Sequence, residues 1–432
     1  MKPVSDAQPH AGPTDTQNCT QSDAAEVENF FNDTASAPPS LKSHGEALAS
    51  FVGEQISVGR PIVCVSAGGT TVPLEANTVR SIDNFSTGMR GALSAEQFLA
   101  LGYAVIYLHR KGCAAPYARV IADKLSPHVD LQLMDRLRLN PSRRLELTTG
   151  DMEAGREDAD EALVGALVAY QAARDDRALL AVAFTTVHEY LWLLRLTAQH
   201  LRPLGRHAMA YLAAAVSDFH LPPAAIPRHK VQSEGGAAGL ELQLQGVPKC
   251  LGALSAHWAP RAFRVAFKLE TDAALLLPKA RAAIARHGVH LVVANELHSR
   301  YRHVDIISAD AVLPIDRDDA DTPIEVPLVA EIAQCHFNYI AAAAADGGDD
   351  DSQQHASAAA AAKPLIPRRA VLRRVWQRRL QKAVTYGALP AGFLLSLWLQ
   401  RRLLSALRGL REGGGDAQGG VGGGTRPSAA RG

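Results

Sequence analysis

Short, continuous apolar runs alternate with amphipathic helical patterns between about residue 46 and residue 341. Continuous apolar runs are typical of parallel strands, which are buried on both faces and are joined by crossover helices. The alternation therefore predicts an α/β fold: a three-layer, doubly wound, Rossmann-like sheet that is mostly parallel. The strand candidates are residues 61–66, 103–110, 179–185, 208–217, 263–270, 290–296 and 304–308. The helix candidates are residues 45–56, 92–102, 187–201 and 273–288.

The two ends of the chain differ in composition from this middle part. Residues 1–45 are rich in Ser, Thr, Asp, Asn, Ala and Pro without periodicity, which predicts a disordered leader. Residues 120–160 are polar and irregular, and we expect them to form a partly ordered surface insertion. The predicted organisation is a leader (1–45), a folded domain (46–341), a low-complexity linker (342–367), a basic amphipathic helical segment (368–411) and a Gly-rich disordered tail (412–432).

The basic segment 368–411 carries an uncharged core between two groups of arginines. That core runs from Val384 to Leu399, is interrupted by Pro390, and is shorter than the ~20 residues that span a bilayer. Such a segment is expected to lie on an anionic membrane surface or to bind a partner helix. Local packing, or a dispensable extension, is the alternative.

Charge and cysteine usage exclude some classes of function. The 45 Lys and Arg residues balance the 44 Asp and Glu residues, so no overall field attracts nucleic acid. The five cysteines are scattered, without the spacing of a zinc site or a disulfide framework, so we expect no protein-bound metal cage and a reducing compartment. The first residues lack the apolar region of a secretory signal, which favours the cytoplasm.

Two glycine-rich loops lie close together in the sequence. The first, "SAGGTTVPLE" at residues 66–75, follows a predicted strand, and the second, "NFSTGMRG" at residues 84–91, precedes a predicted helix. Gly68, Ser86, Gly88 and Gly91 would offer amides, hydroxyls and the positive end of a helix dipole to an anion. Neither loop matches GxGxxG or GxxxxGK[ST], and each could be only a tight turn or a helix cap. Together they favour binding of a nucleotide or a phosphate.

Polar groups also occur at the ends of predicted strands and in the loops beside them. Ligands of doubly wound sheets bind at the carboxyl ends of the strands, so these groups are candidates for contacts with a ligand. The alternatives are turn caps, core side chains and solvated surface charges. The residues are Arg80, Asn84, Asp218, Lys230, Phe267, Lys268 and Asn295.

Taken in order, several stretches resemble the phosphopantothenoylcysteine synthetases, or phosphopantothenate–cysteine ligases, in their stand-alone eukaryotic form. The stretches are "SAGGTTVPLEANTVRSIDNFSTGMRG", "YLAAAVSDF", "HKVQS", "VPK", "FKLETD" and "VVAN", within residues 45–341. The resemblance implies a homodimeric ligase of coenzyme A biosynthesis that uses ATP or CTP with Mg²⁺. The carboxylate of 4′-phosphopantothenate would attack the α-phosphate and release pyrophosphate, and cysteine would then replace the nucleoside monophosphate.

The resemblance also assigns roles to single residues. It implies nucleotide contacts for Gly68, Ser86, Gly88, Gly91, Phe267 and Asn295. It implies phosphopantothenate contacts for Asn84, Ala214, Ala215 and Asp218, with Arg80 reaching the substrate phosphate across the dimer interface. Lys230 would stabilise charge at the α-phosphate, Asn84 would fix the carboxylate or the acyl carbonyl, and Lys268 has no assigned role.

Two other classes of function compete with a ligase. A nicotinamide-dependent reductase could use a Rossmann-like sheet, and the cluster His109–Arg110–Lys111 could suit a 2′-phosphate. The absence of GxGxxG from the first loop argues against this class. The second alternative is a non-catalytic nucleotide-binding module recruited by its basic tail.

Overall fold

The computed structural model describes residues 19–124, 137–147, 156–230, 232, 241–317, 319 and 322–345. The chain divides into two compact units, residues 1–368 and 369–432, and all described residues belong to the first. Of the predicted linker 342–367, residues 342–345 instead belong to helix α10 (Glu325–Ala345). The rest of the linker, the basic segment and the Gly-rich tail lie outside the described residues, so their predicted roles stay predictions. Within the described part, no helix combines the length and the apolar character needed to cross a bilayer.

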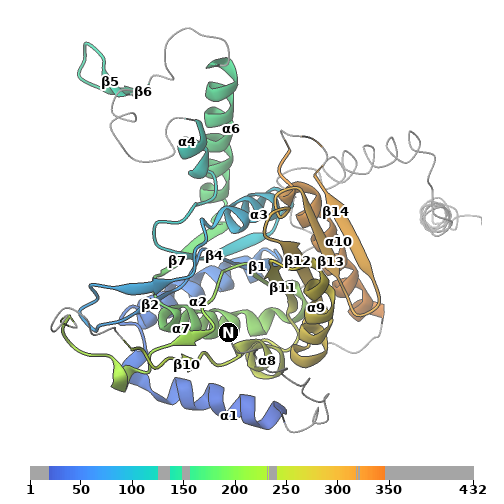
Figure 1. Ribbon diagram of the computed structural model, residues 1–432. Helices are drawn as coiled ribbons and strands as arrows, with labels where there is room; N and C mark the ends of the chain where they lie inside the picture. Colours follow the sequence, from blue (N-terminus) through green and yellow to red (C-terminus); the bar gives the residue numbers. More distant parts are fainter. Residues whose placement is uncertain are drawn as a thin grey trace, which may run out of the picture. The chain divides into compact units, whose positions relative to one another are not determined.

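An eight-stranded sheet forms the centre of the unit (Figure 1). Its order is β14-β13-β12-β11-β8-β1-β4-β7. The strands are β1 (Ile62–Ala67), β4 (Ala104–Arg110), β7 (Leu179–Phe184), β8 (Ala208–Leu212), β11 (Phe263–Glu270), β12 (Leu291–Glu296), β13 (His303–Ile307) and β14 (Val312–Asp316). The six strands from β12 to β7 are parallel, and β13 and β14 add an antiparallel edge. The predicted α/β class with a mostly parallel sheet is confirmed.

Helices cover both faces of this sheet, because alternate side chains of each strand point to opposite faces. Even-numbered residues of β1 and β4, such as Cys64 and Ile106, share a core with the neighbouring helices α2 and α7. On the opposite face, Tyr211 of β8 packs against Phe98 of α3, and Phe263 of β11 packs against His336 of α10. The main helices are α2 (Leu41–Ser57), α3 (Met89–Ala100), α7 (Val187–Leu201), α9 (Ala273–His287) and α10 (Glu325–Ala345).

The remaining elements are short or lie at the rim of the sheet. Three two-stranded ribbons join β2 (Thr71–Pro73) to β3 (Ser81–Asp83), β5 (Leu137–Leu139) to β6 (Leu145–Leu147), and β9 (Phe219–His220) to β10 (Gln245–Gly246). The remaining helical segments are α1 (Cys19–Asn32), η1 (Thr34–Ser36), α4 (Arg119–Lys124), α6 (Arg156–Asp175), η2 (Arg202–His207), η3 (Pro223–Ala225), α8 (Cys250–Ala253) and η4 (Leu254–Trp258). Within the predicted insertion 120–160, the described residues include α4, the β5–β6 ribbon and the start of α6.

Local sequence explains why most boundaries were predicted correctly. Helix α7 begins where Thr186 accepts a hydrogen bond from the backbone of Glu189, and the Glu189 carboxylate accepts one from the backbone of Thr186. This reciprocal cap satisfies amides at the start of the helix. The predicted strand 208–217 instead ends at Leu212. Its continuation forms a loop because the amides of Ala214 and Ser217 donate to the hydroxyls of Ser66 and Thr70.

The predicted leader requires a correction from Cys19 onward. Residues 19–45 contain α1, η1 and the start of α2, whereas residues 1–18 lie outside the described residues. The ring of Phe31 is buried in α1 and meets Trp192 and Trp258 edge to face, at centroid distances of 5.0 and 5.5 Å. Buried aromatic side chains of this size offset the entropy of ordering a polar helix. The stretch is polar on average, so its few buried apolar residues did not indicate a helix in the sequence.

Candidate functional site

A cavity of about 570 Å³ lies where the parallel strands end. The loops after β3, β8 and β10, the start of α3 and the ends of β11 and β12 provide its walls. Eight residues singled out from the sequence line it: Asn84, Ser86, Ala214, Ala215, Asp218, Phe267, Lys268 and Asn295. The cavity brings together residues that are up to two hundred positions apart because β8, β11 and β12 are neighbours in the sheet.

The loop after β1 and the loop after β8 are joined by backbone hydrogen bonds. The amide of Ala215 donates to the carbonyl of Gly68 at 2.8 Å, and the amide of Thr70 donates to the carbonyl of Ala215 at 3.1 Å. The amide of Ala214 donates to the Ser66 hydroxyl at 3.2 Å. Both alanine amides are therefore engaged within the protein. A ligand would meet these residues through their carbonyls and methyl groups.

The predicted phosphate-binding glycines have their side-chain positions filled by protein. A Cβ on Gly68 would lie 2.7 Å from the Cβ of Arg110, and one on Gly91 would lie 2.4 Å from the Cβ of Ala67. Gly88 has a φ of 76°, and a Cβ there would lie 2.8 Å from the Sγ of Cys113. Close packing therefore requires glycine at all three positions. Gly68, Gly88 and Gly91 do not belong to the cavity lining that the described residues form.

Hydroxyl groups precede the first turn of α3. The amide of Gly88 donates to the Ser86 hydroxyl at 3.3 Å, and the amide of Met89 donates to the Thr87 hydroxyl at 3.4 Å. Both distances are long for N–H···O bonds, so an anion could replace these acceptors at small cost. Since Ser86, Thr87 and Met89 line the cavity, this helix start is the part of the two loops that faces it.

Two side chains at the ends of β11 and β12 suit a nucleoside. The Phe267 ring lines the cavity and is supported edge to face by Tyr211, with centroids 4.9 Å apart. Asn295 is 8% exposed, and its Oδ1 has no hydrogen-bond partner among the described residues. An unpaired buried acceptor is costly, so this atom indicates a donor that a ligand would supply. An aromatic face beside such an acceptor can hold a base.

The cavity lining carries more positive than negative charge. Four cations line it, namely Arg90, Lys249, Lys268 and Arg300. In the lining that the described residues form, Asp218 is the only carboxylate, and its Oδ1 lies 2.7 Å from Lys249 Nζ. Outside the lining, Glu325 pairs with Arg90 and Glu270 pairs with Lys268 at 3.5 Å, so the positive charge of the lining is partly balanced. The donors of these four cations suit a ligand with several anionic groups.

Three of these cations were not identified from the sequence. Arg90 lies within the second glycine-rich loop, and its guanidinium is 2.9 Å from the buried Glu325 of α10. Lys249 belongs to the quoted "VPK" stretch, and Arg300 follows β12. From the sequence, only the "VPK" motif could have suggested that Lys249 lies near the end of β8. The ion pair of Arg90 gave no sequence signal, since its partner is in the last described helix.

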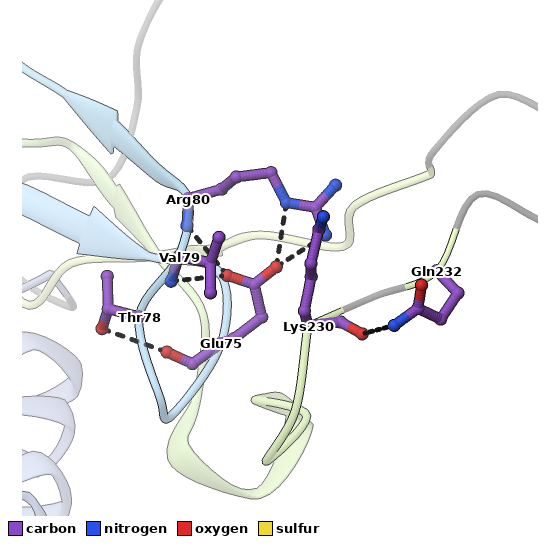
Figure 2. A network of polar contacts seen from close by, with 6 residues as sticks. All are labelled: Glu75, Thr78, Val79, Arg80, Lys230 and Gln232. Carbon is purple, nitrogen blue, oxygen red and sulfur yellow. Dashed lines mark hydrogen bonds and ion pairs between the residues drawn. The ribbon is translucent and has the colours of Figure 1, made fainter.

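Arg80 and Lys230 lie outside the cavity lining but belong to neighbouring loops. Arg80 precedes β3, and its guanidinium binds Glu75 with a shortest distance of 2.7 Å (Figure 2). The loop of Arg80 is joined to the segment before Lys230, because the amide of Ala76 donates to Pro227 and that of Asn77 donates to Arg228. Lys230, predicted to act in catalysis, and Arg80, predicted to bind the substrate phosphate, thus lie in one region outside the cavity lining.

The cluster that could suit a 2′-phosphate has another role in this structure. The Arg110 guanidinium lies 2.8 Å from the Asp83 carboxylate, and the His109 ring stacks on Tyr107 with centroids 5.0 Å apart. Burial lowers the pKa of His109, which disfavours a charged ring at this position. Neither His109 nor Arg110 is part of the described cavity lining. The cluster therefore supports the packing of β4 and does not support the reductase alternative.

Comparisons with known proteins agree with the ligase interpretation. The family described as "DNA/pantothenate metabolism flavoprotein C-terminal domain" matches residues 185–342. Human "Phosphopantothenate--cysteine ligase" is 42% identical over 307 residues, which cover 70% of this chain and 95% of the human protein. "Phosphopantothenate--cysteine ligase CAB2" of Saccharomyces cerevisiae is 35% identical over 336 residues, which cover 73% of this chain and 87% of the yeast protein.

A solved structure extends this similarity to three dimensions. A Cab2 mutant in complex with phosphopantothenate-cysteine has a TM-score of 0.63 and 35% identity, and the match covers 71% of this chain and 96% of that one. A second structure of a Cab2 mutant has a TM-score of 0.66 and 34% identity, and the match covers 74% of this chain and 99% of that one. On this evidence the chain belongs to the phosphopantothenate–cysteine ligase family.

Proposed function

We propose that the cavity activates the carboxylate of phosphopantothenate with a nucleoside triphosphate and then transfers the acyl group to cysteine. A carboxylate oxygen attacks the α-phosphorus, the bond from that phosphorus to the bridging oxygen breaks, and pyrophosphate leaves. The cysteine amine then attacks the acyl carbon and loses a proton, and the nucleoside monophosphate leaves with the electron pair. The observation that supports this proposal most directly is a lining with four cations and one ion-paired carboxylate.

The nucleotide is proposed to lie between the start of α3 and the ends of β11 and β12. Phe267 would stack on the base, and the unpaired Asn295 Oδ1 would accept a hydrogen bond from the nucleoside. Ser86 and the amides near Gly88 would bind phosphate oxygens, with the helix dipole favouring negative charge there. Gly68 and Gly91 would act indirectly, because their lack of a side chain allows the close packing of this cavity wall. Both ATP and CTP have a base with a donor amino group that suits Asn295.

Phosphopantothenate is proposed to lie along the loop after β8. Asn84, at the beginning of the second loop, would fix the reacting carboxylate or acyl carbonyl. Asp218 would accept a hydrogen bond from the pantoate hydroxyl or amide, and Lys249, whose Nζ lies 2.7 Å from its Oδ1, would be beside it. Ala214 and Ala215 would contact the chain of the substrate, since their own amides bind the neighbouring loop.

A second copy of the chain is proposed to complete the site. Apolar side chains on and beside the β2–β3 ribbon are exposed, including Val79, Ile82 and Phe85, the last of which is 91% exposed. Phe85 also lines the cavity, and a group of exposed apolar side chains close together is typical of a surface that binds a partner. Arg80 is on the same ribbon and outside its own cavity lining, so in a homodimer it could reach the phosphate bound by the partner.

Lys230 and Mg²⁺ are proposed to balance charge as the α-phosphate reacts. Lys230 is at the end of a loop attached to the β2–β3 ribbon and would approach the phosphate when the site assembles. The described residues contain no group of three His, Cys, Asp or Glu side chains arranged for a metal. The oxygens of Asn84 and Ser86 could complement nucleotide phosphates and water around Mg²⁺, which usually binds with few protein ligands. The ion would supply charge neutralisation on the phosphates.

Release of pyrophosphate in the absence of cysteine tests the order of the two steps. With phosphopantothenate, Mg²⁺ and either ATP or CTP, the protein should release pyrophosphate up to one equivalent per site before cysteine is added. Addition of cysteine should then restore continuous turnover. A mixture without phosphopantothenate is the control, because no substrate carboxylate is then available for activation. Pyrophosphate that appears only together with cysteine would contradict the acyl-nucleotide intermediate.

A further inference from the structure

We infer that Glu75 is a positioning residue that holds the Arg80 guanidinium in the orientation needed to bind the substrate phosphate. This inference rests on the proposed function, in which Arg80 reaches the phosphate bound by the partner subunit. Glu75 would act through Arg80 and would not contact phosphopantothenate itself. Glu75 is the last residue of the first glycine-rich loop, and no role was expected for it from the sequence.

The Glu75 carboxylate is bound on both of its oxygens. Oε1 accepts hydrogen bonds from Arg80 Nε at 3.0 Å and from Arg80 Nη2 at 2.7 Å. Oε2 accepts from the backbone amide of Arg80 at 3.0 Å and from that of Val79 at 3.3 Å. Figure 2 shows the carboxylate between the side chain and the backbone of the same arginine. Glu75 thus fixes Arg80 at both ends, at its amide and at its guanidinium.

Burial of the two partners is unequal, as a positioning role requires. The Glu75 side chain is 0% exposed, whereas the Arg80 side chain is 40% exposed. Burial opposes ionisation of Glu75, but the hydrogen bonds from Arg80 and Val79 outweigh it and lower the pKa of the carboxyl group. The anion is therefore permanent near neutral pH. Glu75 binds Nε and Nη2 of the guanidinium, and the exposed 40% of the Arg80 side chain is the part that a phosphate could contact.

The same carboxylate stabilises the turn that joins the two cationic loops. The amide of Leu74 donates to the carbonyl of Arg80 at 3.0 Å, which closes the base of the turn. At its tip, the amides of Ala76 and Asn77 donate to Pro227 and Arg228 at 2.9 and 3.2 Å. In Figure 2 the Lys230 side chain points to the same side as the Arg80 guanidinium. Glu75 thereby organises the backbone on which the Lys230 segment rests.

An ordinary surface ion pair does not have this architecture. Glu54 and Arg177 form such a pair at 2.8 Å, with both side chains more than one-third exposed. Exposed pairs contribute little to stability because water and mobility compete with them. Glu75 differs in being buried, in binding two backbone amides and in orienting an arginine with exposed surface. Preorganisation of that arginine would reduce the entropy lost when a phosphate binds.

The variant Glu75→Gln tests the inference, with Glu54→Gln as the matched control. In Glu75→Gln the KM for phosphopantothenate should rise about ten-fold, as expected for loss of a charged hydrogen-bond acceptor, while kcat stays near its wild-type value. The KM values for the triphosphate and for cysteine should not change. Activity with pantothenate, which lacks the phosphate, should be the same in the variant and the wild type. Glu54→Gln should leave all these constants unchanged.

Arg80→Ala and the double variant separate failure of the inference from failure of the proposed function. The ratio of kcat/KM for phosphopantothenate to that for pantothenate should fall in Glu75→Gln and in Arg80→Ala. It should fall no further in the double variant than in Arg80→Ala, since one residue acts through the other. A fall in Arg80→Ala without a fall in Glu75→Gln overturns the role of Glu75 and leaves that of Arg80. An unchanged ratio in both removes Arg80 from the phosphate site, and Glu75 with it.

A purely structural role for Glu75 has a different signature. Equal losses with phosphopantothenate and pantothenate would show that Glu75→Gln only weakens the fold, and this result overturns the inference. If Glu75→Gln does not fold, Glu75→Asp keeps the charge but is one methylene shorter, so it cannot bind both ends of Arg80. A folded Glu75→Asp enzyme should show the same fall in the ratio. A wild-type ratio in that enzyme overturns the inference.

Discussion

Single residues in this site owe their properties to burial and to one or two neighbours. Asp218 faces the cavity as an ion-paired carboxylate because Lys249 is 2.7 Å away. Asn295 is buried, and its Oδ1 has no hydrogen-bond partner in the part of the chain that the structure describes, whereas the buried Arg264 donates to the carbonyls of Pro260 and Gly288. An unpaired buried oxygen beside an aromatic ring is what a site complementary to a ligand would show before the ligand binds. The chemistry of the site therefore depends on which side-chain donors and acceptors are available to form hydrogen bonds with the substrates.

Lys230→Ala should separate binding from catalysis. Because Lys230 is proposed to stabilise charge that develops on the α-phosphate, its removal should lower kcat by about 10² to 10³, the cost typical of one preorganised donor. The affinity for the nucleotide, measured by titration calorimetry, should stay near that of the wild type. Lys111→Ala, at an exposed lysine after β4, is the control and should have normal turnover. Unchanged turnover in Lys230→Ala would exclude this lysine from the mechanism.

At the scale of elements, helix α1 is attached to the site through aromatic and histidine packing. Phe30 of α1 stacks on His188 of α7 with centroids 5.4 Å apart, and His188 Nε2 lies 3.2 Å from His220 Nδ1 of β9. α1 also contacts α8, which directly follows Lys249 in the cavity wall. Burial and the neighbouring His220 lower the pKa of His188 to about 4. The attachment of α1 therefore requires a neutral histidine pair.

The pH dependence of stability should report this attachment. A histidine whose pKa is 6.5 when unfolded and about 4 when folded is neutral in both states above pH 6.5. As the pH falls from 6.5 to 4, the unfolded state binds the proton first, so the free energy of unfolding should decrease by up to about 3 kcal/mol from this group. Urea unfolding at several pH values measures the effect.

Replacement of the histidine identifies its share of the pH dependence. His188→Asn cannot be protonated, so its stability should decrease less steeply than that of the wild type between pH 6.5 and 4. The matched control is His298→Asn at an exposed histidine, which should retain the wild-type slope. If His188→Asn has the same slope as the wild type, protonation of this pair does not limit the packing of α1.

For the whole molecule, the main proposal is that each site is built from two chains. The β2–β3 ribbon carries Arg80 together with the exposed Ile82, and the cavity carries the groups proposed to bind nucleotide and acyl chain. A chain alone would then have a nucleotide site without its full phosphate site. Such a division makes activity depend on assembly.

Mixed dimers test this division directly. Arg80→Ala and Asn84→Ala should each be nearly inactive alone, because each removes a contact from every site. After the two variants are unfolded and refolded together, about half of the dimers are mixed and each has one intact site, so about one quarter of wild-type activity should return. Copurification through different tags verifies that mixed dimers form. Mixed dimers without recovered activity would place Arg80 in the site of its own chain.

The sequence by itself determined the elements of this fold. Each parallel strand is buried on both faces, so β1 and β12 are visible as continuous apolar runs whatever their neighbours are. Helix α7 is specified by its periodicity and by the reciprocal cap of Thr186 and Glu189. The candidate residues at strand ends were also found in this way, because carboxyl ends of parallel strands share one edge. Other elements were not among those expected from the sequence, including α1 with its sparse apolar content, α6, α10 and the edge strand β14.

The tertiary structure alone decided which side chains meet. Pairing of β9 with β10 places Asp218 beside Lys249, and the docking of α10 places Glu325 beside Arg90, 235 positions away in the sequence. It also decided that neighbouring protein atoms leave no room for a side chain at Gly68 and Gly91, and that a buried Glu75 binds Arg80. The hydrophobic periodicity of a segment shows only which of its residues face the interior, and this is a property of the segment alone. Pairing of charges depends on distances across the sheet, and these exist only after the strands have been ordered.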